Sequence, residues 1–149
     1  MHSLLIALHA GTGVLAMLAG GIALYRGRLF DVYLGSLVVT TLFLALAVVA
    51  EWTVLDVGSQ VLFTAFTLLA VVMVARAALA RGLDRRSPAY LEHVGFTLVA
   101  LFDAFVVIAV LNAGAPVWLV VASGVLIAVA GHFALQATKR ALAAESVPV

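Results

Sequence analysis

The sequence predicts an all-α fold, an integral membrane bundle of five transmembrane helices. Of its 149 residues, 66% are hydrophobic and only 10% are charged, whereas soluble domains are about half apolar and about a quarter charged. A water-soluble fold of this length has too little interior to hide so much apolar surface. Five stretches also reach the roughly 20 apolar residues that a helix needs to cross the hydrocarbon. We therefore expect a lipid bilayer to surround most of the chain.

The five predicted spans cover residues 4–25, 30–50, 57–79, 90–111 and 116–135. Short polar or glycine-containing breaks separate them, and Pro116 suits the first turn of a helix. Apolar runs such as 42–50 lack the alternation that a membrane β-barrel strand requires. No break is long enough to fold by itself, so residues 1–149 are predicted to form a single domain.

The basic residues predict the orientation of the helices. With five spans, all of them fall on one side of the membrane: Arg26, Arg28, Arg76, Arg81, Arg85, Arg86, Lys139 and Arg140. The positive-inside rule places that side in the cytoplasm, with the N-terminus outside and the C-terminus inside. The first span could instead be a cleaved leader, but it lacks the basic start and the small-residue cleavage site of one. Arg-rich usage with a single Lys suggests a GC-rich prokaryotic source, and hence a prokaryotic cytoplasmic membrane.

Small residues recur at helical spacing on two spans. Ala16 and Gly20 are four apart in the first span, and Gly124 and Ala128 are four apart in the fifth, before Gly131. Within lipid, helices associate by close contact of such residues. We expect these faces to meet another helix, in the same chain, in a homo-oligomer or in a larger membrane complex.

Asp103 is the principal candidate site residue, because it lies near the middle of the fourth span. Ionisable groups inside a membrane are costly and often functional. A proton or cation relay would make the protein a small proton-coupled carrier or channel. The alternative is a buried hydrogen bond that fixes helix register.

Histidines on adjacent spans suggest a second site. His93 and His132 fall at similar depth and could be axial ligands of a haem b in an electron-transfer protein. Separate hydrogen bonds to Glu92, Gln136 or the backbone are the alternative. Two histidines alone make a poor zinc site, so apart from this haem no cofactor or metal ion is predicted.

A third candidate site lies near the outer leaflet. His2 and His9 share one helix face, and Glu51 and Asp56 fall at the same predicted depth. His9 and Glu51 are therefore candidate proton or ion ligands. Ordinary interfacial solvation of these polar groups is the alternative.

Several functional classes are disfavoured. A net charge of +1 without a basic cluster disfavours nucleic-acid binding. The absence of Cys excludes disulfides and thiolate metal sites. No motif indicates a nucleophile, a paired-carboxylate site or any other catalytic residue. The leading prediction is a non-enzymatic membrane protein that acts as an oligomer or as an accessory subunit of a membrane complex.

The first hairpin resembles an uncharacterised family of small polytopic bacterial membrane proteins. The similar positions are His9, Ala16, Gly20, Arg26-Gly27 and Gly35, which follow a family pattern of His, Gly, Lys-Gly, a second His and a final Gly. Asp31 stands where the family has its second His. The resemblance implies a helical membrane protein without an established activity, and the missing His counts against a His-pair site in this hairpin.

Overall fold

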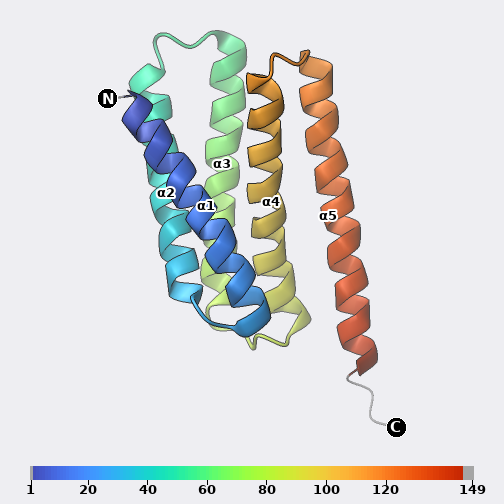
Figure 1. Ribbon diagram of the computed structural model, residues 1–149. Helices are drawn as coiled ribbons and strands as arrows, with labels where there is room; N and C mark the ends of the chain where they lie inside the picture. The colour runs from blue at the N-terminus through green and yellow to red at the C-terminus, as the bar shows by residue number, and fades with distance from the viewer. Residues whose placement is uncertain (1, 146–149) are drawn as a thin grey trace. The chain divides into compact units, whose positions relative to one another are not determined.

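The computed structural model describes the backbone of residues 2–145 and the side chains of residues 4–144. Helices and their connecting turns make up this part of the chain, which contains no strand (Figure 1). The five helices are α1 His2–Arg26, α2 Phe30–Glu51, α3 Val57–Ala80, α4 Pro88–Asn112 and α5 Val117–Glu145. All five are long and apolar enough to cross a membrane. The predicted helical class and the number of candidate spans are therefore confirmed.

The fifth helix extends beyond the membrane span that the sequence analysis predicted. The predicted span ended at Leu135, and α5 continues to Glu145. Hydrocarbon thickness sets where a span leaves the lipid, not where its helix ends. Residues 136–145 are rich in Ala and other good helix formers, so the helix extends beyond the apolar stretch. At the other end, Pro116 precedes the first helical residue, and its carbonyl oxygen accepts from Leu119 N at 2.9 Å.

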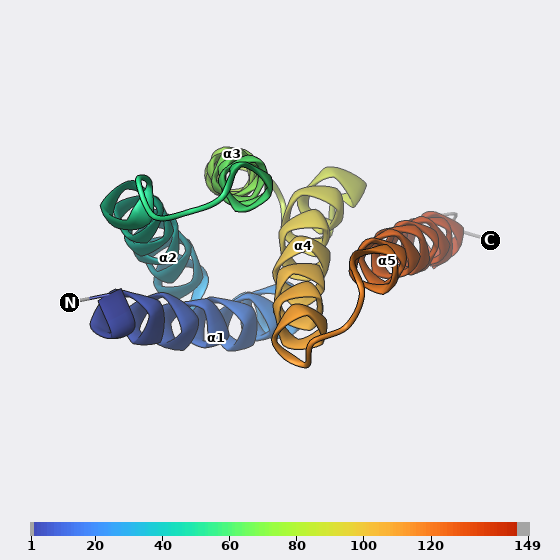
Figure 2. The same cartoon turned by 90° about the horizontal axis from the view of Figure 1, so that it is seen from above.

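Two compact units divide the chain, one up to Ala78 and one from Leu79 onward. In the first unit, α1 packs along α2, and among the described residues α3 does not come as close to either of them (Figure 2). Ala16 and Ala23 of α1 are completely buried, as is Tyr33 of α2. Alanines at a helix interface allow the two backbones to approach closely.

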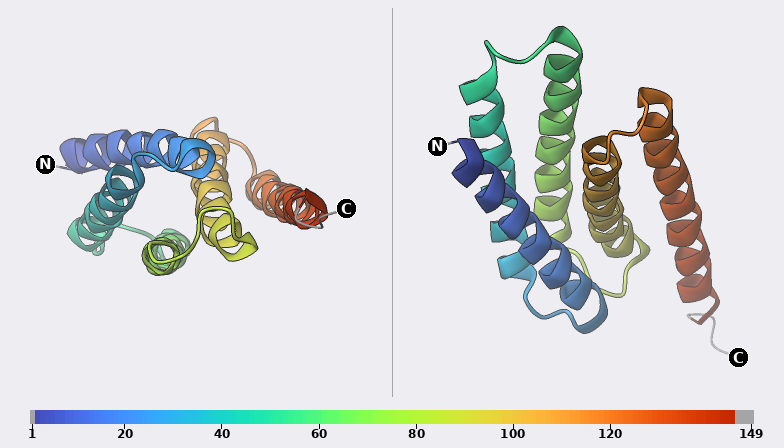
Figure 3. Two further views of the ribbon diagram at one scale, coloured as in Figure 1. Left: turned by 90° about the horizontal axis from the view of Figure 1, so that it is seen from below. Right: turned by 45° about the horizontal axis from the view of Figure 1, so that its top comes forward.

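In the second unit, α4 and α5 form an antiparallel helical hairpin (Figure 3). Two glycines allow their close approach. A Cβ built on Gly131 would overlap the side chain of Val99, and one built on Gly95 would overlap the end of Leu135. Each glycine thus accommodates a branched side chain of the opposite helix. The predicted small-residue face of the fifth span therefore meets α4 at Gly131.

Glycines at positive φ shape two of the turns. Gly27 has φ 64°, and its N–H donates to Ala23 O at 3.0 Å, which ends α1. Gly114 has φ 75° and follows the end of α4, where its N–H donates to Leu111 O at 3.0 Å. Together with a bond of 3.3 Å from the next N–H to Val110 O, this forms a Schellman motif. Glycine adopts these left-handed conformations without the strain that a Cβ would introduce.

Substitution at Gly131 is expected to weaken the α4–α5 hairpin. In Gly131→Ala the new methyl group meets Val99, a β-branched side chain with few alternative rotamers. Overpacking of this kind costs about 1–3 kcal/mol, more than the gain of up to about 1 kcal/mol in helix propensity. The free energy of unfolding, measured by denaturant titration in detergent, should therefore fall. Gly95→Ala should cost less, because the end of Leu135 can rotate away.

Gly21→Ala is the matched control, because a Cβ at Gly21 meets nothing within 4 Å. It should leave the free energy of unfolding unchanged or raise it. Equal effects at Gly21 and Gly131 would contradict the packing of Gly131 against Val99.

Candidate functional site

Asp103 lies on the side of α4 that faces α5. A Cβ built on Gly124 of α5 would lie 3.5 Å from Asp103 Oδ1 and 3.9 Å from Oδ2. Oδ1 is buried and has no hydrogen-bond partner among the described residues. At this oxygen, the structure does not provide the hydrogen bond that the alternative interpretation of Asp103 requires.

His9 takes part in a polar network that joins α1 to α2. Its Nδ1 is 3.0 Å from the backbone oxygen of Thr40. A carbonyl oxygen only accepts, so Nδ1 is the donor of this bond. The Thr40 hydroxyl donates to Thr12 Oγ1 at 2.9 Å, and Thr12 donates to Leu8 O at 2.7 Å. His9 is thus a contact between two helices as well as a candidate ligand.

Thr12 and Thr40 are polar members of this network that the sequence analysis missed. Thr12 follows His9 by three residues, so the two side chains share one face of α1. That spacing was the available signal for Thr12. No such signal marked Thr40, because its meeting with His9 depends on how α1 and α2 are aligned.

The two carboxylates predicted near the outer leaflet have different surroundings. Glu51 ends α2, and its backbone oxygen accepts from Val54 N at 2.9 Å. Asp56 instead caps α3: Oδ1 accepts from Ser59 N at 3.1 Å, and Oδ2 accepts from Ser59 Oγ at 2.7 Å. Asp56 therefore stabilises the first turn of α3.

His93 and His132 lie on adjacent helices of the second unit. His93 Nδ1 is buried and, within the described part of the chain, has no hydrogen-bond partner. His132 is exposed, and its ring makes an edge-on contact with Phe133 at a centroid separation of 5.9 Å. His2, the fourth histidine, has a side chain that lies outside the described residues. Haem ligation by His93 and His132 stays a prediction.

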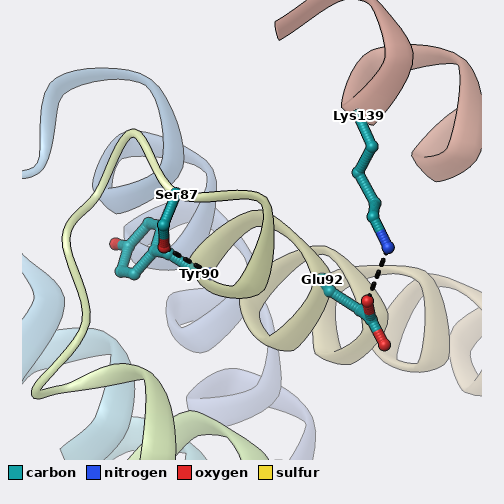
Figure 4. A network of polar contacts seen from close by, with 4 residues as sticks. All are labelled: Ser87, Tyr90, Glu92 and Lys139. Carbon is teal, nitrogen blue, oxygen red and sulfur yellow. Dashed lines mark hydrogen bonds and ion pairs between the residues drawn. The ribbon is translucent and has the colours of Figure 1, made fainter. Parts of the chain in front are cut away.

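An ion pair and a helix cap mark the open end of the α4–α5 hairpin (Figure 4). Lys139 Nζ lies 2.6 Å from Glu92 Oε2, so Glu92 pairs with α5, whereas the sequence suggested it as a possible partner of His93 or His132. Ser87 caps α4, because its Oγ accepts from Tyr90 N at 3.1 Å. Pro88 follows this cap in the first turn, where its missing N–H costs nothing.

Comparisons with known proteins assign no family to this arrangement: no family model, curated protein or solved structure matches the chain. Among the described residues, no group of three or more His, Asp and Glu side chains could hold a metal ion. The resemblance of the first hairpin to a bacterial membrane-protein family stays a prediction. The helices define the broad class, a helical protein with five candidate membrane spans.

Removing the Ser59 hydroxyl is expected to raise the pKa of Asp56. The hydrogen bond from this hydroxyl, followed by the one from Ser59 N, holds the pKa below its ordinary value of 3.8. Because the pKa of Asp56 is lower in the folded state than in the unfolded chain, the ionised carboxylate stabilises the fold at pH values above the unfolded-state pKa. This stabilisation is lost as the pH falls through the folded-state pKa. In Ser59→Ala the titration midpoint of the Asp56 carboxyl carbon, followed by NMR in micelles, should move up toward 3.8.

Ser123→Ala provides the control, because that hydroxyl donates to Val120 O and not to a carboxylate. It should leave the Asp56 midpoint unchanged. An unchanged midpoint in Ser59→Ala would show that the hydroxyl does not stabilise the ionised carboxylate.

A haem b bound by His93 and His132 would give the purified protein a Soret absorption band. The band should disappear in His132→Ala, because haem loses one axial ligand. Gln136→Ala, on the same helix, should keep it. A protein that stays colourless and takes up no haem when haem is added would remove this assignment.

Proposed function

We propose that this chain is a non-enzymatic integral membrane protein that functions in association with other transmembrane helices, as a homo-oligomer or as a subunit of a larger complex. The observation that supports this proposal is the outer face of α5. Gly124 and Gly131 point toward α4, whereas Leu126 and Phe133 are 69% and 67% exposed. Val129, between them, is exposed as well. In a bilayer such a face contacts either lipid chains or another helix.

The side chains on the outer face of α5 are compatible with a helix partner. Helix association in lipid depends on close packing and not on exclusion of apolar groups from water. The hairpin formed with α4 uses the glycine-bearing side of α5. The side that carries Leu126, Val129 and Phe133 provides bulky side chains that can pack against small residues of a neighbouring helix.

The proposed location is a prokaryotic cytoplasmic membrane, with the N-terminus outside. The basic residues support this orientation, because those outside the helices all lie in the α1–α2 and α3–α4 connections. They are Arg28, Arg81, Arg85 and Arg86. The α2–α3 and α4–α5 connections contain no Lys or Arg. Such a bias favours a cytoplasmic position for the basic connections.

Cysteine cross-linking tests the proposed association, since the chain contains no native cysteine. In native membranes, Leu126→Cys should give a covalent dimer, or a covalent adduct with a partner subunit, after copper-phenanthroline oxidation or treatment with a thiol-reactive bifunctional reagent. Ala113→Cys, which is exposed in the turn after α4, is the matched control and should give much less. Treatment with a reductant should cleave the disulfide formed by oxidation and return the cross-linked species to separate chains.

The mass of the particle in native nanodiscs gives an independent measurement. It should exceed that of one chain by a whole number of copies or by a partner subunit. A monomeric particle, together with no adduct at Leu126 or at Phe133→Cys, would contradict the proposal and leave lipid as the neighbour of this face of α5.

A further inference from the structure

The surface of α4 that faces α5 carries a carboxyl group in the middle of the span. Glu92, Val99, Asp103 and Val107 recur at helical spacing along α4. Glu92 pairs with Lys139, and Val99 fills the space at Gly131. Asp103 and Val107 both lie against Gly124, with Val107 at 3.2 Å from a Cβ built there. Asp103 is therefore part of the helix–helix interface.

Within the described hairpin, α5 places no charge where it could neutralise an ionised Asp103. Residues 117–131 of α5 contain no ionisable side chain, and the first that follows is the exposed His132. Lys139 is fifteen residues beyond Gly124, about 22 Å along the helix axis, and it is already bound to Glu92. The hydroxyl of Ser123, next to Gly124, donates to Val120 O.

Asp103 has no compensating group on its own helix either. The ionisable side chain of α4 that comes next toward its N-terminus is His93, ten residues away and about 15 Å along the axis. In the other direction, residues 104–112 contain no ionisable side chain. Asp103 Oδ1 thus stays buried without a donor from any described residue.

The three glycines of this interface differ in what they accommodate. Gly95 and Gly131 make room for Leu135 and Val99, and a Cβ at either would overlap those side chains. At Gly124, a Cβ would lie 3.2 Å from Val107 and at ordinary contact distance from both carboxyl oxygens of Asp103. Packing against the carboxyl group alone would therefore permit an alanine at this position. The missing methyl group leaves space beside the carboxyl oxygens on the α5 side.

We infer that Asp103 is a membrane-embedded proton-binding site, and that Gly124 is the residue that keeps the space beside its carboxyl group open. A carboxylate without a counter-charge or a hydrogen-bond donor is strongly disfavoured in hydrocarbon, and uptake of one proton makes the group neutral. The ligand is a proton, which binds the carboxylate and is released again as the acid ionises. This inference does not depend on the proposed association of α5, and it would provide the binding step of a proton-coupled carrier or channel.

Infrared spectroscopy of the full chain in lipid nanodiscs tests the protonation state. The other three aspartates, Asp31, Asp56 and Asp84, lie at helix ends or in turns. With ¹³C-labelled aspartate, a neutral-pH sample should show the carbonyl stretch of one protonated acid beside the carboxylate bands of the others. Asp103→Asn should remove the acid band. The wild-type spectrum alone decides the protonation state if the variant does not fold.

Chemical labelling tests the role of Gly124. A lipid-soluble carbodiimide reacts only with the protonated acid: the O–H adds across the N=C=N group, and the adduct rearranges to a stable N-acylurea. Peptide mass spectrometry should locate this adduct on Asp103. Gly124→Ala should reduce the labelling rate several-fold, because the methyl group fills the space beside the carboxyl oxygens, whereas Gly21→Ala should leave the rate unchanged.

Two results would overturn the inference. One is an ionised Asp103 at neutral pH, seen as no acid band in the wild type; a carboxylate band that shifts with added Na⁺ would then identify a metal-cation site instead. The other is equal labelling of wild type and Gly124→Ala with both folded by circular dichroism, which would remove the role of Gly124.

Discussion

Hydrocarbon offers no hydrogen-bond partner, and the structure suits this constraint from the backbone outward. A helix satisfies its own N–H and C=O groups, which is why apolar runs of this length fold as helices in a bilayer. Several hydroxyl groups in the spans follow the same rule by bonding to the backbone of their own helix. Thr41 donates to Leu37 O at 2.9 Å, and Thr67 donates to Phe63 O at 2.8 Å. Such side chains can therefore enter the lipid at small cost.

In lipid, helices lose the usual reason to associate, because lipid chains are as apolar as leucine. Shape and a few polar bonds must hold the hairpins together, and the two hairpins use them differently. The α1–α2 pair combines buried alanines such as Ala16 with the bond from His9 to Thr40 O. The α4–α5 pair combines the contact of Gly131 with Val99 and the ion pair at Lys139. In both, small residues set the distance between helices, and polar bonds select the register.

Properties that depend on one segment at a time could be predicted from the sequence, whereas those that depend on two helices could not. Apolar length sufficed to find all five helices, and Pro116 marks a helix start by local geometry alone. The α5 helix continues beyond the predicted span, because helix propensity and not lipid thickness decides where the helix ends beyond Leu135. The partner of Glu92 is 47 residues away, so it depends on the rotation of α5 about its own axis. Apolar periodicity gives little information on that rotation when nearly every face of a helix is apolar.

Asp103 and His9 show how the constraint separates structural polar groups from candidate sites. His9 Nδ1 reaches a carbonyl oxygen of the neighbouring helix, so burial of that atom is compensated within the protein. Asp103 Oδ1 reaches no donor among the described residues, although it lies in the same kind of interface. Natural sequences usually violate a local physical rule where function requires it. An aliphatic side chain at position 103 would pack against Gly124 without this penalty, and it is this penalty that supports the inferred proton site at Asp103.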